Sequence, residues 1–186
     1  MLNRLEGYVN LHSIREFTFE AGRPDSINRQ KLKILKSYGV TRISINPQTM
    51  NEETLVKIGR RHTTKDIIDK FYMARDIGFD NINMDIIIGL PDEDLSSIDK
   101  TMSELKKLSP ESITIHTMAI KRASILNEID YKSKTDSAVS MYNYASQCCR
   151  EIGMIPYYMY RQKNMVSPLE NVGYSKREKN VYITYK

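Results

Sequence analysis

Alternating apolar and polar residues mark several segments of this chain as strands that bury one side. Residues 81–91 (NINMDIIIGLP) place Asn83 and Asp85 on one side and Met84 and Ile86 on the other, before a Gly-Leu-Pro turn. Successive side chains of a strand point to opposite faces of its sheet. The alternation recurs in residues 14–20, 41–46 and 112–116, which predicts four strands, each with one apolar and one polar face.

Helical periodicity separates these strands. Apolar residues at spacings of three and four predict a helix that Ser26 caps, a helix that Asp94 opens, and helices over residues 1–12, 51–58, 64–77 and 134–152. Thr63, with Asp66 three residues later, predicts a capping box for the helix at 64–77. A fifth strand is predicted at residues 155–160, whereas residues 161–180 show no clear periodicity.

The order strand, helix, glycine, strand is typical of βα units around a parallel sheet. The apolar strand faces would pack on the helices, and the polar faces would line a full or partial barrel. Buried polar groups without partners each cost about 1–3 kcal/mol, so this pattern predicts a lumen filled by water or a ligand. The polar positions are Thr18, Glu20, Ser44, Asn46, Asn83, Asp85, Thr114 and His116.

Candidate binding residues lie where these strands end. Ligand groups gather at the carboxyl ends of strands in βα sheets. Those ends carry Glu20, Gln48, Asp85 and His116, and Arg60 follows the short helix after the second strand. An arginine in that position can fold back onto an anionic ligand. We therefore expect one polar site at this edge of the sheet.

Composition narrows the class of protein. The chain has 186 residues, of which 40% are hydrophobic and 27% charged, which is typical of a soluble protein. It lacks an apolar run of about 18 residues, so we expect a cytoplasmic protein without a membrane segment. The net charge of +5 is spread over many segments, which favours a solvated surface over a nucleic-acid interface. Cys148 and Cys149 are adjacent, which excludes a CxxC metal site.

Several motifs together resemble one family. Residues 17–25 (FTFEAGRPD), 42–50 (RISINPQTM), 58–62 (IGRRH) and 83–91 (NMDIIIGLP) resemble the oxygen-independent coproporphyrinogen III oxidases of the radical S-adenosylmethionine (SAM) superfamily. Residues 157–164 (YYMYRQKN) and 169–174 (LENVGY) are most similar to its Gram-positive coproporphyrinogen dehydrogenase branch.

The resemblance implies a fold of the α/β class. This fold is a partial parallel (β/α) barrel of the radical SAM type, with SAM in the lumen at the carboxyl ends of the strands. Residues 1–120 would form the barrel. Residues 121–186 would form a C-terminal extension made of a helix, a strand and a substrate-side loop.

The resemblance also implies roles for individual residues. Glu20 would bind the amino group of SAM, Gln48 and Arg60 would contact its carboxylate and neighbouring polar groups, and Asp85 would bind its ribose hydroxyls. Each role suits the chemistry of the side chain, because carboxylates accept hydrogen bonds and a guanidinium matches a carboxylate. Contacts with substrate propionates are expected from Lys121, Arg122 and Arg161.

The chain departs from the family at the iron–sulfur cluster. The family holds a 4Fe–4S cluster on a CxxxCxxC loop after its first strand, and this sequence has no such motif. The resemblance would place residue 1 ahead of the family's third strand, so we expect the first two βα units to be absent and the chain to be a C-terminal fragment that is inactive alone. Its first strand would lack a neighbour on one side, which predicts self-association through an exposed edge.

The activity implied for the intact enzyme belongs to haem biosynthesis. It is the oxidative decarboxylation of two propionates to vinyl groups by a SAM-dependent oxidoreductase, through a 5′-deoxyadenosyl radical. Its partners would be the porphyrinogen substrate and an electron donor. Two alternatives stay open, namely a haem-binding chaperone with the same barrel and a metal-dependent βα-barrel hydrolase that uses Glu20, Asp85 and His116.

Overall fold

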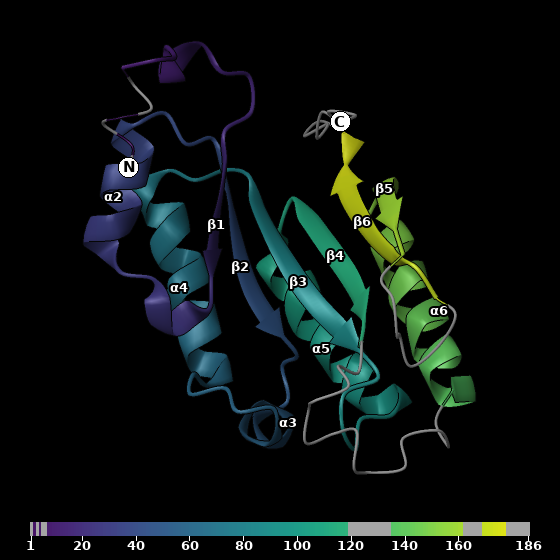
Figure 1. Cartoon of the computed structure of the whole chain (residues 1–186). Helices are drawn as coiled ribbons and strands as arrows, with labels where there is room; N and C mark the ends of the chain where they lie inside the picture. Colours follow the sequence, from purple (N-terminus) through teal and green to yellow (C-terminus); the bar gives the residue numbers. More distant parts are fainter. Residues whose placement is uncertain (1, 3, 5–6, 119–134, 162–168, 178–186) are drawn as a thin grey trace.

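The fold is a mixed α/β structure built on one six-stranded sheet (Figure 1). The computed structural model describes residues 2, 4, 7–118, 135–161 and 169–177. The sheet order is β1-β2-β3-β4-β6-β5. The four strands β1 to β4 are parallel, whereas β6 runs antiparallel to both of its neighbours. Strand bounds are β1 (Thr18–Gly22), β2 (Arg42–Gln48), β3 (Ile82–Ile88), β4 (Ser112–Thr117), β5 (Met154–Tyr160) and β6 (Asn171–Lys176).

The helices of the described residues cover one face of this sheet (Figure 1). The covering layer consists of α2 (Arg29–Ser37), α4 (Thr64–Ile77), α5 (Leu95–Leu108) and α6 (Thr135–Glu151). The described residues also form the helix α3 (Glu52–Lys57) and the 3-10 turns η1 (Leu11–Ser13) and η2 (Pro24–Ser26). None of the helices in the described ranges is long and apolar enough to cross a membrane.

The apolar strand faces pack against the helices, as the alternation predicts. The isoleucines of these faces form the core and are at most 1% exposed; they are Ile43, Ile45, Ile82, Ile86, Ile88, Ile113 and Ile115. Burying one such side chain stabilises the fold by about 1.5–3 kcal/mol. This burial fixes the register of the sheet, because a slip by one residue would turn the polar face into the core.

Local signals set two helix starts as predicted. The hydroxyl of Thr63 accepts a hydrogen bond from the Asp66 amide at 3.1 Å, and the Asp66 carboxylate accepts one from the Thr63 amide at 2.8 Å. The capping box of α4 is therefore confirmed. At α5, the Asp94 carboxylate accepts from the Ser97 amide at 3.0 Å.

Three predictions near the amino terminus are wrong. The helix over residues 1–12 is interrupted by a turn at Gly7, a residue that disfavours helix. The first strand begins at Thr18 and not at residue 14, because pairing with β2 starts there. The cap of α2 is Asn28 and not Ser26, whose hydroxyl is engaged by the carbonyls of Ala21 and Arg23 in the turn before it.

The strand β6 lies in the stretch for which the sequence shows no periodicity. It inserts between β4 and β5, and its residues are almost all buried. As a result, β5 joins the sheet through an antiparallel partner and not through a direct βα crossover. The division at residue 120 stays a prediction. At the other end of the sheet, β1 has one hydrogen-bonded neighbour among the described strands, and self-association through it also stays a prediction.

Candidate functional site

The polar strand faces share one cavity of about 420 Å³ on the side of the sheet without helices. The strand register brings these side chains together, because Glu20 pairs with Ser44 and Asp85 with Thr114. The predicted convergence of polar strand faces is therefore confirmed for Glu20, Asn83, Asp85, Thr114 and His116. Residues of five strands line the cavity. They are Glu20, Arg42, Asn83, Asp85, Thr114, His116, Tyr157 and Tyr158.

The carboxylate of Asp85 is held by side chains of its own strand and the next. Its Oδ1 accepts a hydrogen bond from Asn83 Nδ2 at 2.6 Å, and its Oδ2 lies 3.6 Å from His116 Nε2. Asn83 is itself fixed, because its Oδ1 accepts from the Thr114 hydroxyl at 3.1 Å and its Nδ2 also donates to Ser44. Oδ1 of Asp85 is therefore oriented before any ligand arrives, whereas the His116 contact at Oδ2 is longer than a hydrogen bond.

His116 links Asp85 to the last residue of β5. The Tyr160 hydroxyl lies 3.4 Å from His116 Nδ1, and the two rings meet edge to face with centroids 6.3 Å apart. The imidazole thus has a neighbour at each nitrogen. This arrangement fixes the ring at the mouth of the cavity, where its side chain is 24% exposed.

Glu20 faces Asp85 across the cavity and remains open to solvent. Partial burial and the negative charge of Asp85 raise the pKa of Glu20 above its ordinary value of 4.5, against smaller opposing effects of Ser44, Arg42 and His116. The ionised form of Glu20 is therefore disfavoured by these surroundings. A cationic group placed beside it would remove that cost.

The raised pKa of Glu20 has a consequence for stability. Between 4.5 and the raised value the folded chain binds more protons than the unfolded chain, so stability decreases as the pH rises through this window. Glu20→Gln should therefore raise the melting temperature at pH 7 but not at pH 4. Because solvent screens an exposed side chain, we expect at most about 0.5 kcal/mol, or roughly 1–2 °C.

Thermal unfolding followed by circular dichroism at the two pH values measures this difference. Glu53→Gln, at an exposed position of α3, is the matched control and should not change the pH dependence. A Glu20→Gln protein that melts below the wild type at pH 7 would contradict the prediction.

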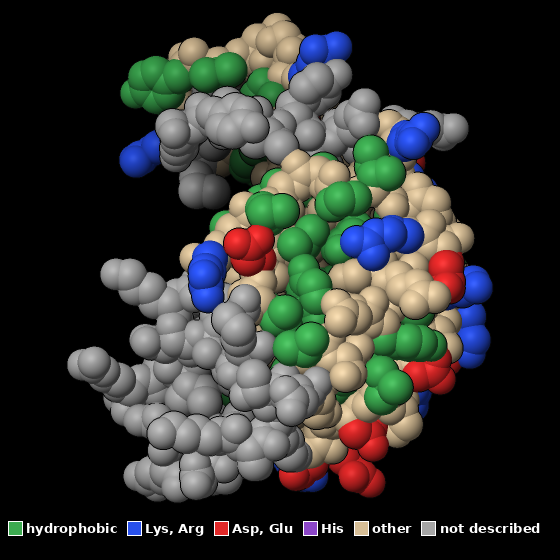
Figure 2. All heavy atoms as spheres, turned by 90° about the vertical axis from the view of Figure 1, so that its right-hand side faces the viewer, with side chains coloured by type: hydrophobic (Ala, Val, Ile, Leu, Met, Phe, Trp, Pro, Cys, Tyr) green, Lys and Arg blue, Asp and Glu red, His purple; other side chains and the backbone are tan. Residues whose placement is uncertain are grey.

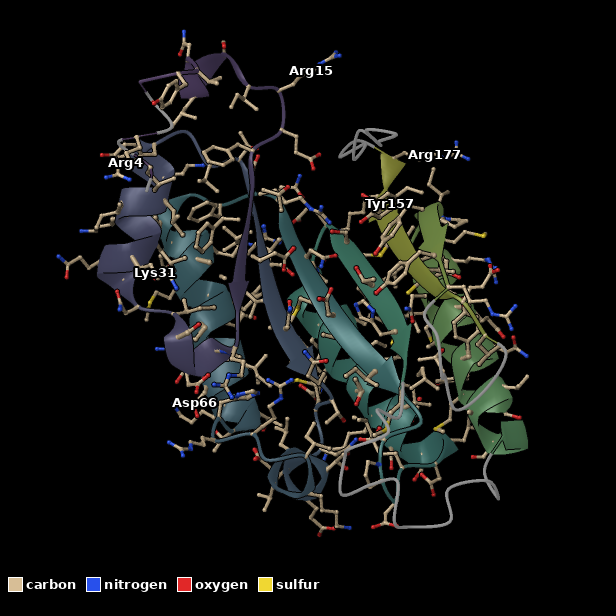
Figure 3. The ribbon with its side chains drawn as sticks, viewed as in Figure 1. Arg4, Arg15, Lys31, Asp66, Tyr157 and Arg177 are labelled. Carbon is tan, nitrogen blue, oxygen red and sulfur yellow. The ribbon has the colours of Figure 1, made fainter. Side chains whose placement is uncertain are left out.

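The opposite end of the cavity is filled by Arg42 and its partners. The guanidinium donates to the Ser112 hydroxyl at 3.0 Å and to the Tyr157 hydroxyl at 3.2 Å, and it lies 3.8 Å from Glu16. Tyr157 is at the end of the sheet where β2 and β4 begin (Figure 3). A ligand would therefore enter from the carboxyl ends of the strands.

Sequence reasoning assigned no role to Arg42 or Tyr157. Arg42 and Ser44 are two residues apart in β2 and therefore lie on the same face of the sheet. The strand alternation thus predicts Arg42 on the polar face. Tyr157 carries no such signal, because a register shift between Pro156 and Tyr158 breaks the alternation there.

Two further predicted residues lie at the same edge but outside the cavity lining. Gln48 ends β2 where the pairing with β3 shifts, and its φ of 70° is unusual for a residue with a side chain. Arg60 follows α3 and is half-buried, and this burial, together with the nearby Arg23, lowers its pKa. Residues with strained backbone dihedral angles, such as Gln48, occur most often at functional sites.

The predicted substrate residues are only partly placed by the structure. Arg161 follows β5 directly and is exposed. Lys121 and Arg122 lie outside the described residues.

The two cysteines are on α6, on the helix-covered side of the sheet. Cys149 is fully buried in the core, and this burial raises its pKa to about 12. They do not fit a 4Fe–4S cluster, which needs three accessible thiolates. Within the described residues, no group of three or more His, Cys, Asp or Glu side chains is placed to hold a metal ion. The described residues therefore offer no set of metal ligands for the hydrolase alternative.

Known proteins that are similar in sequence to this chain support the family resemblance. The chain is 46% identical over 174 residues to the oxygen-independent coproporphyrinogen-III oxidase-like protein HemZ of Bacillus subtilis, which covers 92% of this chain and 35% of that protein. It is also 35% identical over 121 residues to the heme chaperone HemW of the same organism, covering 65% of this chain and 32% of HemW. The chain thus spans about a third of the length of these relatives.

The fold matches a solved structure of the same kind. Coproporphyrinogen III oxidase (HemN) from Escherichia coli, described as a radical SAM enzyme, superposes with a TM-score of 0.73 at 18% identity. The match covers 96% of this chain and 39% of HemN. Residues 4–105, more than half of the chain, match the family model of the radical SAM superfamily. The chain therefore belongs to the radical SAM superfamily.

Proposed function

We propose that this chain provides the SAM-binding and substrate-facing part of an oxygen-independent coproporphyrinogen III oxidase. The observation that carries the proposal is the pair of carboxylates, Glu20 and Asp85, that converge on one cavity from β1 and β3. The similarity to the HemZ protein supports the choice of reaction.

The side chains of the cavity suit the polar groups of SAM. Asp85, whose Oδ1 is oriented by Asn83, would accept hydrogen bonds from the two ribose hydroxyls. Glu20 would pair with the ammonium group, which would stabilise its ionised form. Gln48 and Arg60, at the same edge of the sheet, would bind the carboxylate of the methionine moiety.

Bound SAM, reduced through a 4Fe–4S cluster, supplies the radical that removes a hydrogen atom from a propionate. Because Cys148 and Cys149 do not fit the cluster, residues outside this chain must hold it. Each propionate loses that hydrogen atom, then CO₂, and gives one electron to an acceptor as the vinyl group forms. The role of this chain is to bind and orient SAM and the porphyrinogen. Reduction of the cluster requires a separate electron donor.

Turnover by a fusion protein tests the proposal. The fusion carries this chain in place of the matching 174-residue segment of the B. subtilis HemZ protein. Incubated without oxygen with SAM, a reductant, an electron acceptor and coproporphyrinogen III, it should form vinyl products, as the unmodified parent should. An active parent with an inactive but folded fusion would argue against the proposal.

A haem-carrier function is the second candidate, because the HemW proteins of several organisms are also similar to this chain. Haem titration separates the two functions. Tight, stoichiometric haem binding by a fusion that forms no vinyl groups would favour the carrier.

A further inference from the structure

We propose that three tyrosines of β5 form a binding wall for the macrocycle of a tetrapyrrole that carries carboxylate groups. The β5 aromatic wall consists of Tyr157, Tyr158 and Tyr160. The chemical class of the ligand rests on the proposed function, whereas the location of the wall rests on the geometry of β5 and β6.

The three rings form a continuous row, of which Tyr157 and Tyr158 line the cavity. The centroids of Tyr157 and Tyr158 are 5.3 Å apart, and those of Tyr158 and Tyr160 are 5.8 Å apart with the rings within 11° of parallel. His116 extends the row beyond Tyr160. Such rings offer large, rigid contact area to a planar ligand at a low cost in conformational entropy.

No helix of the described chain covers this side of the sheet (Figure 1). Tyr157 and Tyr158 are partly exposed, and Tyr160 is 41% exposed. Figure 2 faces the β5 edge of the sheet and shows exposed hydrophobic side chains on this side of the molecule. Exposed apolar surface of this kind is typical of a binding site.

Gly173 shows that the wall is built into the sheet. A Cβ at this position would meet Tyr158 Cδ1 at 2.7 Å and the Tyr157 ring at 2.8 Å. Its backbone conformation lies outside the left-handed region, so the glycine is needed for space and not for its dihedral angles. The rings of Tyr157 and Tyr158 therefore lie directly on the backbone of β6.

The hydroxyls explain why we expect an acidic ligand. The Tyr157 hydroxyl accepts from Arg42, and the Tyr160 hydroxyl contacts His116. The Tyr158 hydroxyl has no hydrogen-bond partner within the described residues, although the residue lines the cavity. Burial raises the pKa of Tyr158, so this hydroxyl remains protonated and able to donate to a carboxylate. A flat ring system with carboxylate groups matches both features.

Titration of this chain with coproporphyrin III, followed by its Soret absorbance and fluorescence, tests the wall. The wild type should bind saturably. We expect Tyr158→Ala to weaken binding about tenfold, Tyr158→Phe about threefold, and Gly173→Ala about tenfold because its methyl group displaces the rings. Tyr72→Ala, at an exposed position of α4, and Gly7→Ala are matched controls that should stay within twofold of the wild type. Thermal unfolding identifies variants that fail to fold.

The outcomes separate this inference from the proposed function. The wall is refuted if the wild type shows no saturable binding, or if folded Tyr158→Ala and Gly173→Ala proteins bind as the wild type does. It is also refuted if Tyr158→Ala weakens SAM binding but leaves coproporphyrin binding unchanged, because adenine would then be the stacked ring. Loss of turnover in the fusion, with intact ring-dependent binding, would overturn the proposed reaction and leave the wall in place.

Discussion

Replacement of Asp85 by asparagine should weaken SAM binding about 100-fold and leave the fold unchanged. The carboxylate accepts from Asn83 and, in our proposal, from the ribose hydroxyls, and an amide group offers one acceptor where the carboxylate has two. Each hydrogen bond to a charged group contributes about 1.5–3 kcal/mol, and 1.4 kcal/mol corresponds to a factor of ten in affinity. Two weakened bonds therefore account for about two orders of magnitude.

Equilibrium dialysis of radiolabelled SAM against the fusion protein, without oxygen, measures this effect. Asp69→Asn is the matched control, because Asp69 lies on the exposed side of α4 and pairs only with Lys65 in the described structure. An Asp85→Asn fusion that binds SAM within threefold of the unsubstituted fusion would remove Asp85 from the proposed site.

Asn83→Ala should give a smaller loss of SAM affinity, of roughly three- to tenfold, because Asn83 only orients the Asp85 carboxylate.

The sequence predicts those parts of the structure that depend on neighbouring residues. Alternation along residues 81–91 places Asn83 and Asp85 in the cavity and Ile86 in the core, because the period of two belongs to the strand itself. The capping box of Thr63 and Asp66 is equally local. The parallel order of β1 to β4 follows from the repeated βα unit, whose crossover leaves few alternatives.

What the sequence cannot predict depends on residues far apart in the chain. The β6 strand gains its order from β4 and β5 on either side, and Gly173 within it is explained by the rings of Tyr157 and Tyr158. Arg42 reaches Ser112, which is 70 residues away in the sequence. The same holds for Glu93, which reads as one more charged residue in a polar turn although it is buried.

Substitution of Glu93 by alanine should destabilise the fold by about 2–4 kcal/mol. Glu93 is only 3% exposed and forms no ion pair with any described residue. Its carboxylate accepts from the Thr49 hydroxyl at 2.5 Å and from Asn51 Nδ2 at 3.0 Å. Thr101 completes the network by accepting from the Met50 amide at 3.1 Å. Removal of the carboxylate leaves buried donors without an acceptor and creates a cavity.

The Glu93 network joins the turn after β2 to the turn after β3. The residues Thr49 and Asn51 directly follow Gln48, whose strained backbone must be held by its surroundings. Loss of Glu93 should therefore loosen the edge of the SAM site and also destabilise the fold. A drop in melting temperature of roughly 4–16 °C follows from the expected free energy for a chain of this length.

Urea unfolding of the wild type and the Glu93→Ala protein measures this free energy. Glu93→Gln keeps the shape and one acceptor, so it should lose about half as much as alanine does. Glu53→Ala, in the exposed first turn of α3, is the matched control and should stay within 0.5 kcal/mol of the wild type, as is usual for surface positions. If Glu93→Ala unfolds at the same urea concentration as Glu53→Ala, the buried carboxylate contributes nothing to stability.

The SAM affinity of the fusion with Glu93→Gln tests separately whether Glu93 supports the SAM site. This variant retains the fold and should bind SAM more weakly only if the Gln48 turn depends on Glu93.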